Sequence, residues 1–177
     1  MPLIDPARSA LLVIDVQARL MPAIDASTLR IANTVRLIRA ARMLGLPLHV
    51  TEQNPAGLGA TCPELEITAG EALPKMSFDS LRDPAIAARL AGDEALVVCG
   101  CEAHVCVLQT VLALRADGRC VHVVADATGS RHDANRIAGL DRMRAHGADI
   151  VTTEMVIFEW LGTAAHPAFK SVMPLIK

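Results

Sequence analysis

Short runs of apolar residues alternate with stretches of helical periodicity along the whole chain. An apolar run of about four to eight residues indicates a buried strand, and apolar positions about three or four residues apart indicate an amphipathic helix. We predict strands at residues 9–16, 48–51, a short segment ending near Lys75, 94–99, 120–124 and 150–153. We predict helices at residues 27–44, 84–90, 104–116, 133–146 and 155–161. Residues 52–70 contain Pro, Gly and Asn, and a long polar loop is expected there.

Polar and glycine residues mark the ends of several of these helices. Ser27 is the candidate N-cap of the first long helix, Gly45 ends it, and Asp133 can cap a later one. Alternating strands and helices are typical of a parallel sheet with helices on both faces. We therefore predict a three-layer α/β/α, Rossmann-like fold with a mostly parallel central sheet of about six strands. A single domain over residues 1–177 is expected.

The composition is apolar for a chain of this length. Hydrophobic residues make up 52% of it, and the mean hydropathy is +0.36. Strands that are buried on both faces of a parallel sheet account for much of this. The excess also suggests surface that is buried between subunits, so we expect a homo-oligomer, with residues 155–161 and 172–176 as candidate contacts.

Charge and residue counts argue against several classes of protein. The net charge is −2 and only 2% of residues are aromatic, so the chain has no evident surface for binding phosphates or stacking bases. No nucleic-acid partner is therefore expected. No apolar run approaches the about 18–20 residues of a membrane span, and no membrane partner is expected. Five irregularly spaced cysteines do not form a disulfide framework, so a reducing, cytoplasmic setting is expected.

Three chemically reactive residues follow the ends of predicted strands. Asp15, Lys75 and Cys106 should meet at one edge of the sheet, because parallel strands bring their carboxyl ends together. A cysteine in the first turn of a helix is close to unpaired N–H groups, which favour the thiolate, and Lys75 adds a positive charge. Asp15 can act as the base. Taken singly, each residue also has an ordinary role, as a helix cap, a solvated charge or a core thiol; the joint pattern predicts acyl transfer through a thioester.

Three motifs carry a resemblance to a known family. Residues 11–17 (Leu-Leu-Val-Ile-Asp-Val-Gln), the Lys-x-x-Phe of 75–78 and the Gly-x-Glu-Ala-His-Val-Cys-Val of 100–107 resemble the isochorismatase-like cysteine hydrolases. That superfamily includes nicotinamidases and N-carbamoylsarcosine amidohydrolases. The resemblance covers nearly the whole chain. Thr51-Glu52-Gln53 and Gly57-Leu58-Gly59 make it most similar to the isochorismatase-domain-containing subgroup.

This resemblance implies a role for each catalytic residue. Asp15 would be the general base, Lys75 would orient and stabilise the thiolate, and Cys106 would be the nucleophile. It also implies a cis peptide bond between Cys101 and Glu102, which would direct the backbone N–H groups of Glu102 and Cys106 at an oxyanion.

Other residues near the strand ends are candidates for substrate binding. Gln17 is on the same side of its segment as Asp15, and Glu52 and Gln53 begin the predicted loop. His104 is close to the nucleophile, and Phe78 is either a pocket wall or a core residue.

Two departures from the family narrow the expected chemistry. Residues 50–55 lack the Asp-x-His metal motif of nicotinamidases. Isochorismatases proper lack the nucleophilic cysteine that this chain has at position 106. The prediction is a cofactor-independent, metal-free hydrolase of a small amide or related C–N bond.

The main alternative is a non-catalytic binding or scaffold protein with the same fold. A redox pair of Cys101 with Cys106 and a zinc site at Cys99, Cys101 and Cys106 with His104 are weaker alternatives. A dehydrogenase is disfavoured because no G-x-G-x-x-G follows the first strand. His49, His122, His146 and His166 show no partner pattern and need no functional interpretation.

Overall fold

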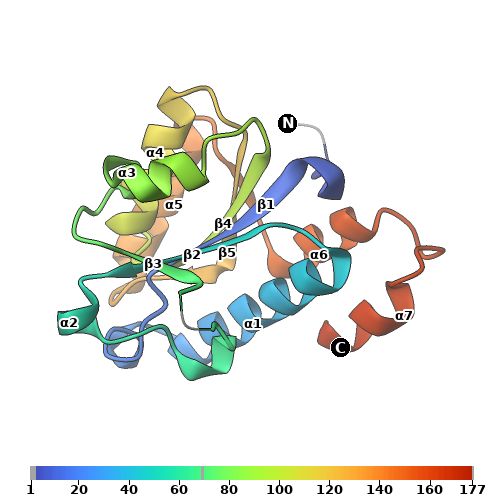
Figure 1. The fold of residues 1–177 in the computed structure, drawn as a ribbon, viewed down its shortest axis with the longest axis horizontal. Coiled ribbons are helices and arrows are strands. Elements are labelled where there is room, and N and C mark those ends of the chain that lie inside the picture. The colour runs from blue at the N-terminus through green and yellow to red at the C-terminus, as the bar shows by residue number, and fades with distance from the viewer. Residues whose placement is uncertain (1–2, 69, 177) are drawn as a thin grey trace.

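A six-stranded parallel sheet lies between two layers of helices (Figure 1). The computed structural model describes residues 3–68 and 70–176. The strand order is β3-β2-β1-β4-β5-β6, and every pairing is parallel. This arrangement confirms the predicted three-layer α/β/α fold. The strands are β1 (Ser9–Ile14), β2 (Leu48–Gln53), β3 (Ala72–Lys75), β4 (Ala95–Cys101), β5 (Val121–Gly129) and β6 (Asp149–Val151).

The helices divide between the two faces of the sheet. The layer of α1 (Ser27–Leu44), α6 (Thr153–Leu161) and α7 (Phe169–Val172) covers one face. The layer of α3 (Pro84–Arg89), α4 (Cys106–Ala116) and α5 (Asp133–Ala145) covers the other.

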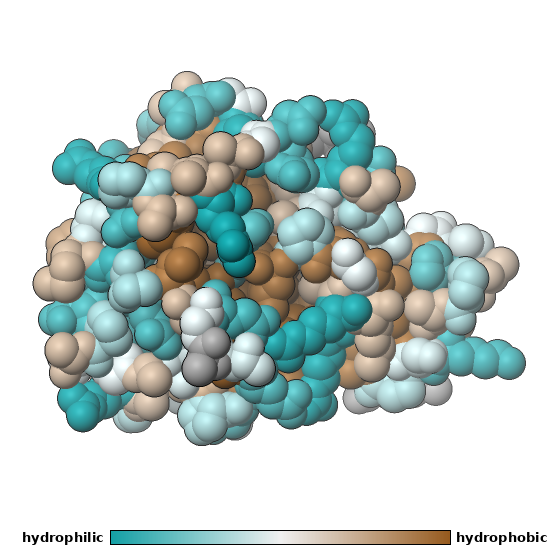
Figure 2. Space-filling model, in the orientation of Figure 1, coloured by the Kyte–Doolittle hydropathy of each residue, from teal (hydrophilic) through white to brown (hydrophobic). Residues whose placement is uncertain are grey.

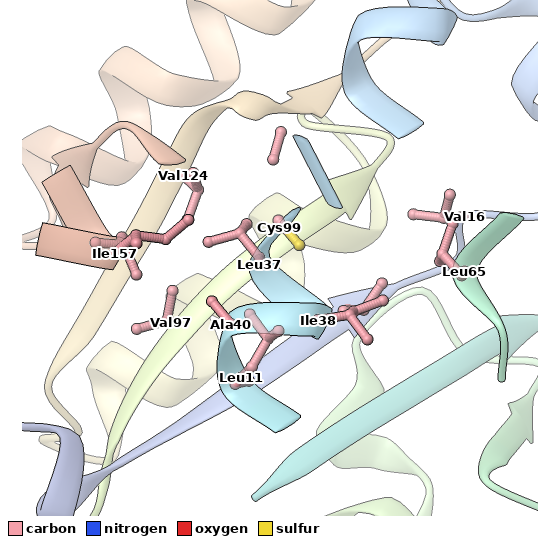
Figure 3. Close-up of a cluster of buried hydrophobic side chains, with 14 of the residues drawn as sticks. Leu11, Val16, Leu37, Ile38, Ala40, Leu65, Val97, Cys99, Val124 and Ile157 are labelled. Atoms are coloured by element: carbon pink, nitrogen blue, oxygen red, sulfur yellow. The ribbon is translucent and has the colours of Figure 1, made fainter. Parts of the chain in front are cut away.

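Side chains of both α1 and the sheet form the hydrophobic core under α1. Figure 3 shows Leu37 and Ala40 of α1 facing Leu11 of β1 and Cys99 of β4. All four residues are fully buried. Cys99 is therefore a core residue, and burial raises the pKa of its thiol to about 12.

Several element boundaries differ from the predicted ones. Ser27 is the first residue of α1 rather than its cap, since Ala26 takes the cap position with a φ of 51°. Asp133 similarly begins α5 after His132. β5 runs to Gly129, well past the predicted end at residue 124, because after a register shift its last residues pair with the end of β4.

The segment predicted as a long loop is largely ordered by local structure. β2 continues to Gln53, α2 spans Pro55–Leu58, and a 3-10 helix spans Pro63–Leu65. Thr61 forms a bridge with Gln17, which ties the segment to the chain after β1. The prediction failed here because turn-forming residues also start short helices. Residue 69 of the predicted loop lies outside the described residues.

The strand order reverses between β1 and β4, and this reversal positions the site. Ligands of such sheets bind beyond the carboxyl ends of the strands at this switch point. Gly100 permits the two strands to approach closely there: its φ is 122°, and a Cβ at this position would lie 2.0 Å from the carbonyl oxygen of Ile14. Only glycine fits, so the residues after β1 and β4 are held side by side.

The surface carries a band of apolar residues across the middle of one face (Figure 2). The predicted subunit contact at residues 155–161 is mostly used within the chain, since Val156, Ile157, Trp160 and Leu161 are buried. Met155 and Phe158 remain exposed by 45% and 42%. Among the described residues, no helix has both the length and the apolar character needed to cross a membrane.

Candidate active site

A buried ion pair occupies the carboxyl edge of the sheet. Asp15 follows β1, Lys75 ends β3, and Lys75 Nζ lies 2.6 Å from Asp15 Oδ2. Neither side chain is exposed to solvent. Thr51 Oγ1 donates a hydrogen bond of 2.7 Å to Asp15 Oδ1. Both carboxylate oxygens of Asp15 are therefore fixed, and the two charges compensate each other away from water.

The backbone at Asp15 takes a left-handed conformation. Its φ is 53°, a region that costs a residue with a Cβ about 1–3 kcal/mol and is found where the surroundings hold it in place. The Asp15 N–H donates to the carbonyl of Thr51, and the Asp15 carbonyl accepts from the N–H of Gln17. These bonds turn the chain out of β1 with the carboxylate beside the end of β2.

Gln53, at the end of β2, connects the ion pair with the cysteine. Its Oε1 accepts from Lys75 Nζ at 2.8 Å and faces Cys106 Sγ at 3.9 Å. Its Nε2 donates to the carbonyl of Met76 at 2.8 Å, which fixes the direction of the amide. Lys75 Nζ also donates to the carbonyl of Ser77 at 3.3 Å, so its three N–H groups are directed at three acceptors.

Cys106 is the first residue of α4, and its residue exposure is 6%. Burial raises the pKa of its thiol to about 12, the charge of Asp15 adds to this, and the charge of Lys75 opposes it. The resting thiol is therefore protonated at neutral pH. This direction is opposite to the readily formed thiolate that the sequence predicts, because the helix start and Lys75 could be located from the sequence but the loss of water around the sulfur could not.

The turn between β4 and α4 presents two backbone donors. The peptide bond between Cys101 and Glu102 is cis. The Ala103 N–H donates to the carbonyl of Gly129, and the N–H groups of Val105 and Val107 donate to the carbonyl of Glu102. Among the hydrogen bonds of the described residues, none uses the N–H of Glu102 or of Cys106. These two amides are available to a developing negative charge.

Glu102 and His104 attach this turn to the end of β5. The Glu102 carboxylate accepts from the backbone N–H of Arg131 at 2.9 Å and from its Nε at 3.1 Å. His104 Nδ1 lies 3.0 Å from Ser130 Oγ. The Glu102 side chain thus fixes the turn.

The side chains of Gln17 and Glu52 bind the protein's own backbone. Gln17 is fully buried and pairs with both backbone groups of Gln53, at 2.8 Å and 3.0 Å, and with the carbonyl of Gly59 at 2.6 Å. Glu52 Oε1 accepts from the N–H and the hydroxyl of Thr61. Both residues shape the site by holding the segment after β2, and contact with a substrate stays a prediction for them.

Phe78 and Thr51 show what the sequence left unresolved. Phe78 is 51% exposed, so it is not a core residue, and its place three residues after Lys75 keeps it a candidate pocket wall. Thr51 was missed although it contacts the carboxylate of Asp15. It lies opposite Ile14 in the β1–β2 register, a pairing that becomes visible only once the strands are aligned.

The cysteines around the turn lie on different sides of the sheet. Cys101 points into the core under α1 and α6, where its Sγ is 3.6 Å from Met21 Sδ. Cys106 belongs to the core under α3, α4 and α5. A disulfide between them would have to cross the sheet, which disfavours the redox alternative. Within the described residues, no three His, Cys, Asp or Glu side chains are placed to hold a metal ion.

A parallel six-stranded sheet with a cysteine, an aspartate and a lysine at its carboxyl edge is the arrangement that the resemblance to isochorismatase-like hydrolases implies. The isochorismatase domain matches residues 9–155, and the chain belongs to this family, which supports a hydrolase role. The resemblance inferred from the sequence is thereby confirmed.

Relatives match nearly the whole chain. It is 39% identical over 175 residues to isochorismatase domain-containing protein 2 of Pongo abelii, covering 97% of this chain and 84% of the relative. It is also 39% identical to isochorismatase domain-containing protein 1 of Salmo salar, but it spans only 62% of that relative's length. The structure of MAR1 ribonuclease from Caenorhabditis elegans aligns with a TM-score of 0.92 at 38% identity, covering 99% of this chain and 92% of that one.

Proposed function

We propose that this protein is a cofactor-independent cysteine hydrolase that cleaves a small amide or a related C–N bond. The observation that carries the proposal is the buried Asp15–Lys75 pair beside the Cys106 thiol, linked to it through Gln53. A thiol needs a base, a counter-charge and oxyanion donors to attack a carbonyl, and this group of residues can supply all three.

The first half of the reaction forms a thioester. Because the resting thiol is protonated, its proton passes to the Asp15 carboxylate while the sulfur attacks the carbonyl carbon. The carbonyl oxygen becomes an oxyanion that the N–H groups of Glu102 and Cys106 stabilise. The C–N bond then breaks as Asp15 returns the proton to the nitrogen, and ammonia or an amine leaves.

The second half regenerates the enzyme. A water molecule gives a proton to Asp15 and attacks the thioester, whose oxygen is again held by the two amides. The C–S bond breaks, the sulfur takes the proton back from Asp15, and the carboxylic acid departs. Lys75 keeps its charge throughout, and its contacts with Asp15 and Gln53 hold both groups in place.

Two other functions remain to be separated from this one by experiment. The solved C. elegans relative bears the name ribonuclease, so RNA is a substrate to test here. Lys75, the cation beside Asp15 and the Cys106 thiol, already directs its three N–H groups at protein acceptors, which favours an amide over a phosphodiester. A scaffold protein of the same fold would show no turnover at all.

The experiment is a hydrolysis screen of small primary and N-substituted amides, with ammonia or amine release as the readout. Hits are repeated with Cys106→Ser, Asp15→Asn and Lys75→Met, and a rapidly quenched reaction is analysed by intact-protein mass spectrometry. We expect an acyl adduct on Cys106 in the wild type and none in Cys106→Ser. The matched control is Cys62→Ser, which removes a buried thiol outside the site.

The outcomes distinguish the candidates. Turnover that survives Cys106→Ser would contradict the thioester mechanism. RNA cleavage by the purified protein, with every amide left intact, would replace the proposal with a ribonuclease function. Absence of turnover together with ligand binding at the strand ends would favour the scaffold.

We also infer that the protein forms a homo-oligomer, because several large apolar side chains remain exposed on its surface. Met155 and Phe158 of α6 are exposed although the other apolar residues of that helix are buried, and Figure 2 shows further apolar surface. Size-exclusion chromatography with light scattering tests this inference, and a monomer at micromolar concentration would reject it.

A further inference from the structure

A second cluster of reactive side chains lies at the opposite, amino edge of the sheet. Cys120 immediately precedes β5, His122 is the second residue of β5, and Asp149 begins β6. Cys120 Sγ lies 3.5 Å from His122 Nε2, and Asp149 Oδ2 lies 3.2 Å from His122 Nδ1. The three groups form a chain from thiol to imidazole to carboxylate, and none of them takes part in the Cys106 site.

The contacts of His122 fix the direction of this chain. A carboxylate can only accept a hydrogen bond, so Asp149 favours the tautomer that carries its proton on Nδ1. Nε2 then presents its lone pair to the Cys120 thiol. The imidazole is almost completely buried, with its side chain 2% exposed, so its orientation is held by the surrounding core. This is the arrangement in which an imidazole accepts a proton from a nucleophile.

The cysteine of this cluster is more exposed than the other four. Cys120 is partly exposed, whereas Cys62, Cys99, Cys101 and Cys106 are buried.

Cys120 and His122 line a cavity of about 350 Å³, which is within the usual size of small-molecule sites. Ile4 and Ala95 contribute apolar wall, and Arg8 and Asp93, which lie 3.8 Å apart as a largely exposed pair, contribute charge.

We propose that Cys120, His122 and Asp149 form a thiol-exchange site that takes small disulfides. His122 Nε2 accepts the Cys120 proton as the sulfur attacks one sulfur of the disulfide. The S–S bond of the small molecule breaks, a new S–S bond forms to Cys120, and the departing thiolate takes the proton from His122. A second small thiol reverses the step, so the modification is reversible.

Thiol–disulfide exchange fits the amino edge of the sheet better than hydrolysis or metal binding. α4 ends at Ala116, shortly before Cys120, so this edge has the negative end of a helix rather than a start with free N–H groups. The carboxyl end of α4 would not stabilise an oxyanion, while a disulfide exchange forms none. The thiol and the carboxylate contact opposite nitrogens of the imidazole, so they do not converge on one metal position.

The test measures the reaction of the folded full chain with oxidised glutathione and, for rates, with 5,5′-dithiobis(2-nitrobenzoate) at pH 7. Peptide mass spectrometry should locate the glutathione on Cys120, and Cys120→Ser should abolish that adduct. Asp149→Asn keeps the shape and an acceptor oxygen but removes the charge, and should slow the Cys120 reaction about tenfold. Asp149→Glu, which keeps the carboxylate, should restore part of the rate.

Two controls make the result specific. Asp141→Asn removes an exposed carboxylate that pairs with Arg144 on α5 and does not line the cavity, and it should leave the rate unchanged. In denaturant, all variants that retain Cys120 should react equally. An adduct on another cysteine, or an Asp149→Asn rate equal to the wild type, would overturn the proposal. Because this site shares no residue with the Cys106 site, neither outcome bears on the proposed hydrolase.

Discussion

The two edges of one sheet hold two thiols in contrasting surroundings. At the carboxyl edge, Cys106 is 6% exposed, starts a helix, and lies beside a carboxylate and a lysine that are both buried. At the amino edge, Cys120 is partly exposed, precedes a strand, and contacts an imidazole. The same residue type thus has different neighbours, charges and access to water at the two ends of the strands.

This difference shows what the parallel topology contributes to chemistry. α4 and α5 begin at the carboxyl edge and end at the amino edge, so these two helices bring their free backbone N–H groups to the carboxyl edge, where a bound carbonyl can use them. The carboxyl edge therefore suits chemistry that builds negative charge on oxygen. The amino edge suits a transfer between sulfur atoms, in which no oxyanion forms.

The largest expected effects separate the two thiols completely. Cys106→Ser should lower amide hydrolysis by about 10³-fold or more, because a serine hydroxyl gives up its proton far less readily than a thiol. Cys120→Ser should leave that rate unchanged. In the disulfide assay the order is reversed: Cys120→Ser should abolish the reaction and Cys106→Ser should leave it unchanged. Steady-state kinetics on the same preparations measures both effects. A loss of hydrolysis in Cys120→Ser would show that the two edges are coupled.

The next effect concerns the ion pairs at the two edges. Asp15→Asn or Lys75→Met alone should lower the free energy of unfolding by about 3–5 kcal/mol, since each leaves one buried charge uncompensated. Asparagine also tolerates the positive φ of position 15, so that variant isolates the charge. Urea denaturation of the single and double variants measures the coupling, and the double variant should lose less than the sum of the two.

The matched pair at the amino edge is Arg8–Asp93, whose side chains are 71% and 95% exposed. Asp93→Asn should leave the unfolding midpoint unchanged, because solvent screens exposed charges. Equal losses at the two edges would mean that the Asp15–Lys75 pair is hydrated in the folded protein.

The carboxyl-edge site was largely predictable from the sequence, and the amino-edge site was not. Asp15, Lys75 and Cys106 each follow an apolar run, so the alternation of strands and helices alone brings them to one edge. Cys120 and His122 are two residues apart and therefore on one side of the strand, which is a usable signal. Asp149 completes the cluster only through the β5–β6 register, in which it lies opposite His122.

The sequence could not show which side chains are shielded from water or how the strands are aligned. It predicted the helix start and the lysine near Cys106 but not the burial that raises the pKa of the thiol. It placed Glu52 and Gln53 in a loop, whereas both belong to β2 and their side chains are held by protein contacts. Each error follows from tertiary contacts that no local pattern encodes.

A smaller effect tests how firmly the turn after β4 is held. Glu102→Gln should destabilise the protein by about 1–2 kcal/mol, because the charge-assisted bonds to Arg131 are weakened while the side chain stays buried. Thermal unfolding measures this. At the amino edge, Glu94→Gln removes the charge of a half-exposed carboxylate 3.9 Å from Arg119. This variant should leave the thermal unfolding temperature unchanged. If Glu102→Gln is equally silent, the backbone alone holds the turn.

The smallest effect follows from the burial of Cys106 and appears only in alkali. An unfolded cysteine ionises near pH 8.5, whereas burial raises the pKa of Cys106 to about 12 in the folded protein. Below pH 8.5 the thiol is protonated in both states, so stability does not depend on it. Above that pH the unfolded chain loses a proton that the folded protein keeps, so stability falls as the pH rises towards 12.

Replacing the thiol should remove this part of the alkaline loss. Between pH 8 and pH 10, the free energy of unfolding of Cys106→Ser should fall by about 1–2 kcal/mol less than that of the wild type. Below pH 8 the two curves should run parallel, which separates the titration from any change in packing. Curves that stay parallel up to pH 10 would mean that the folded site accepts a thiolate as readily as water does. The start of α4 and Lys75 would then outweigh burial, and Cys106 would attack its substrate without first passing a proton to Asp15.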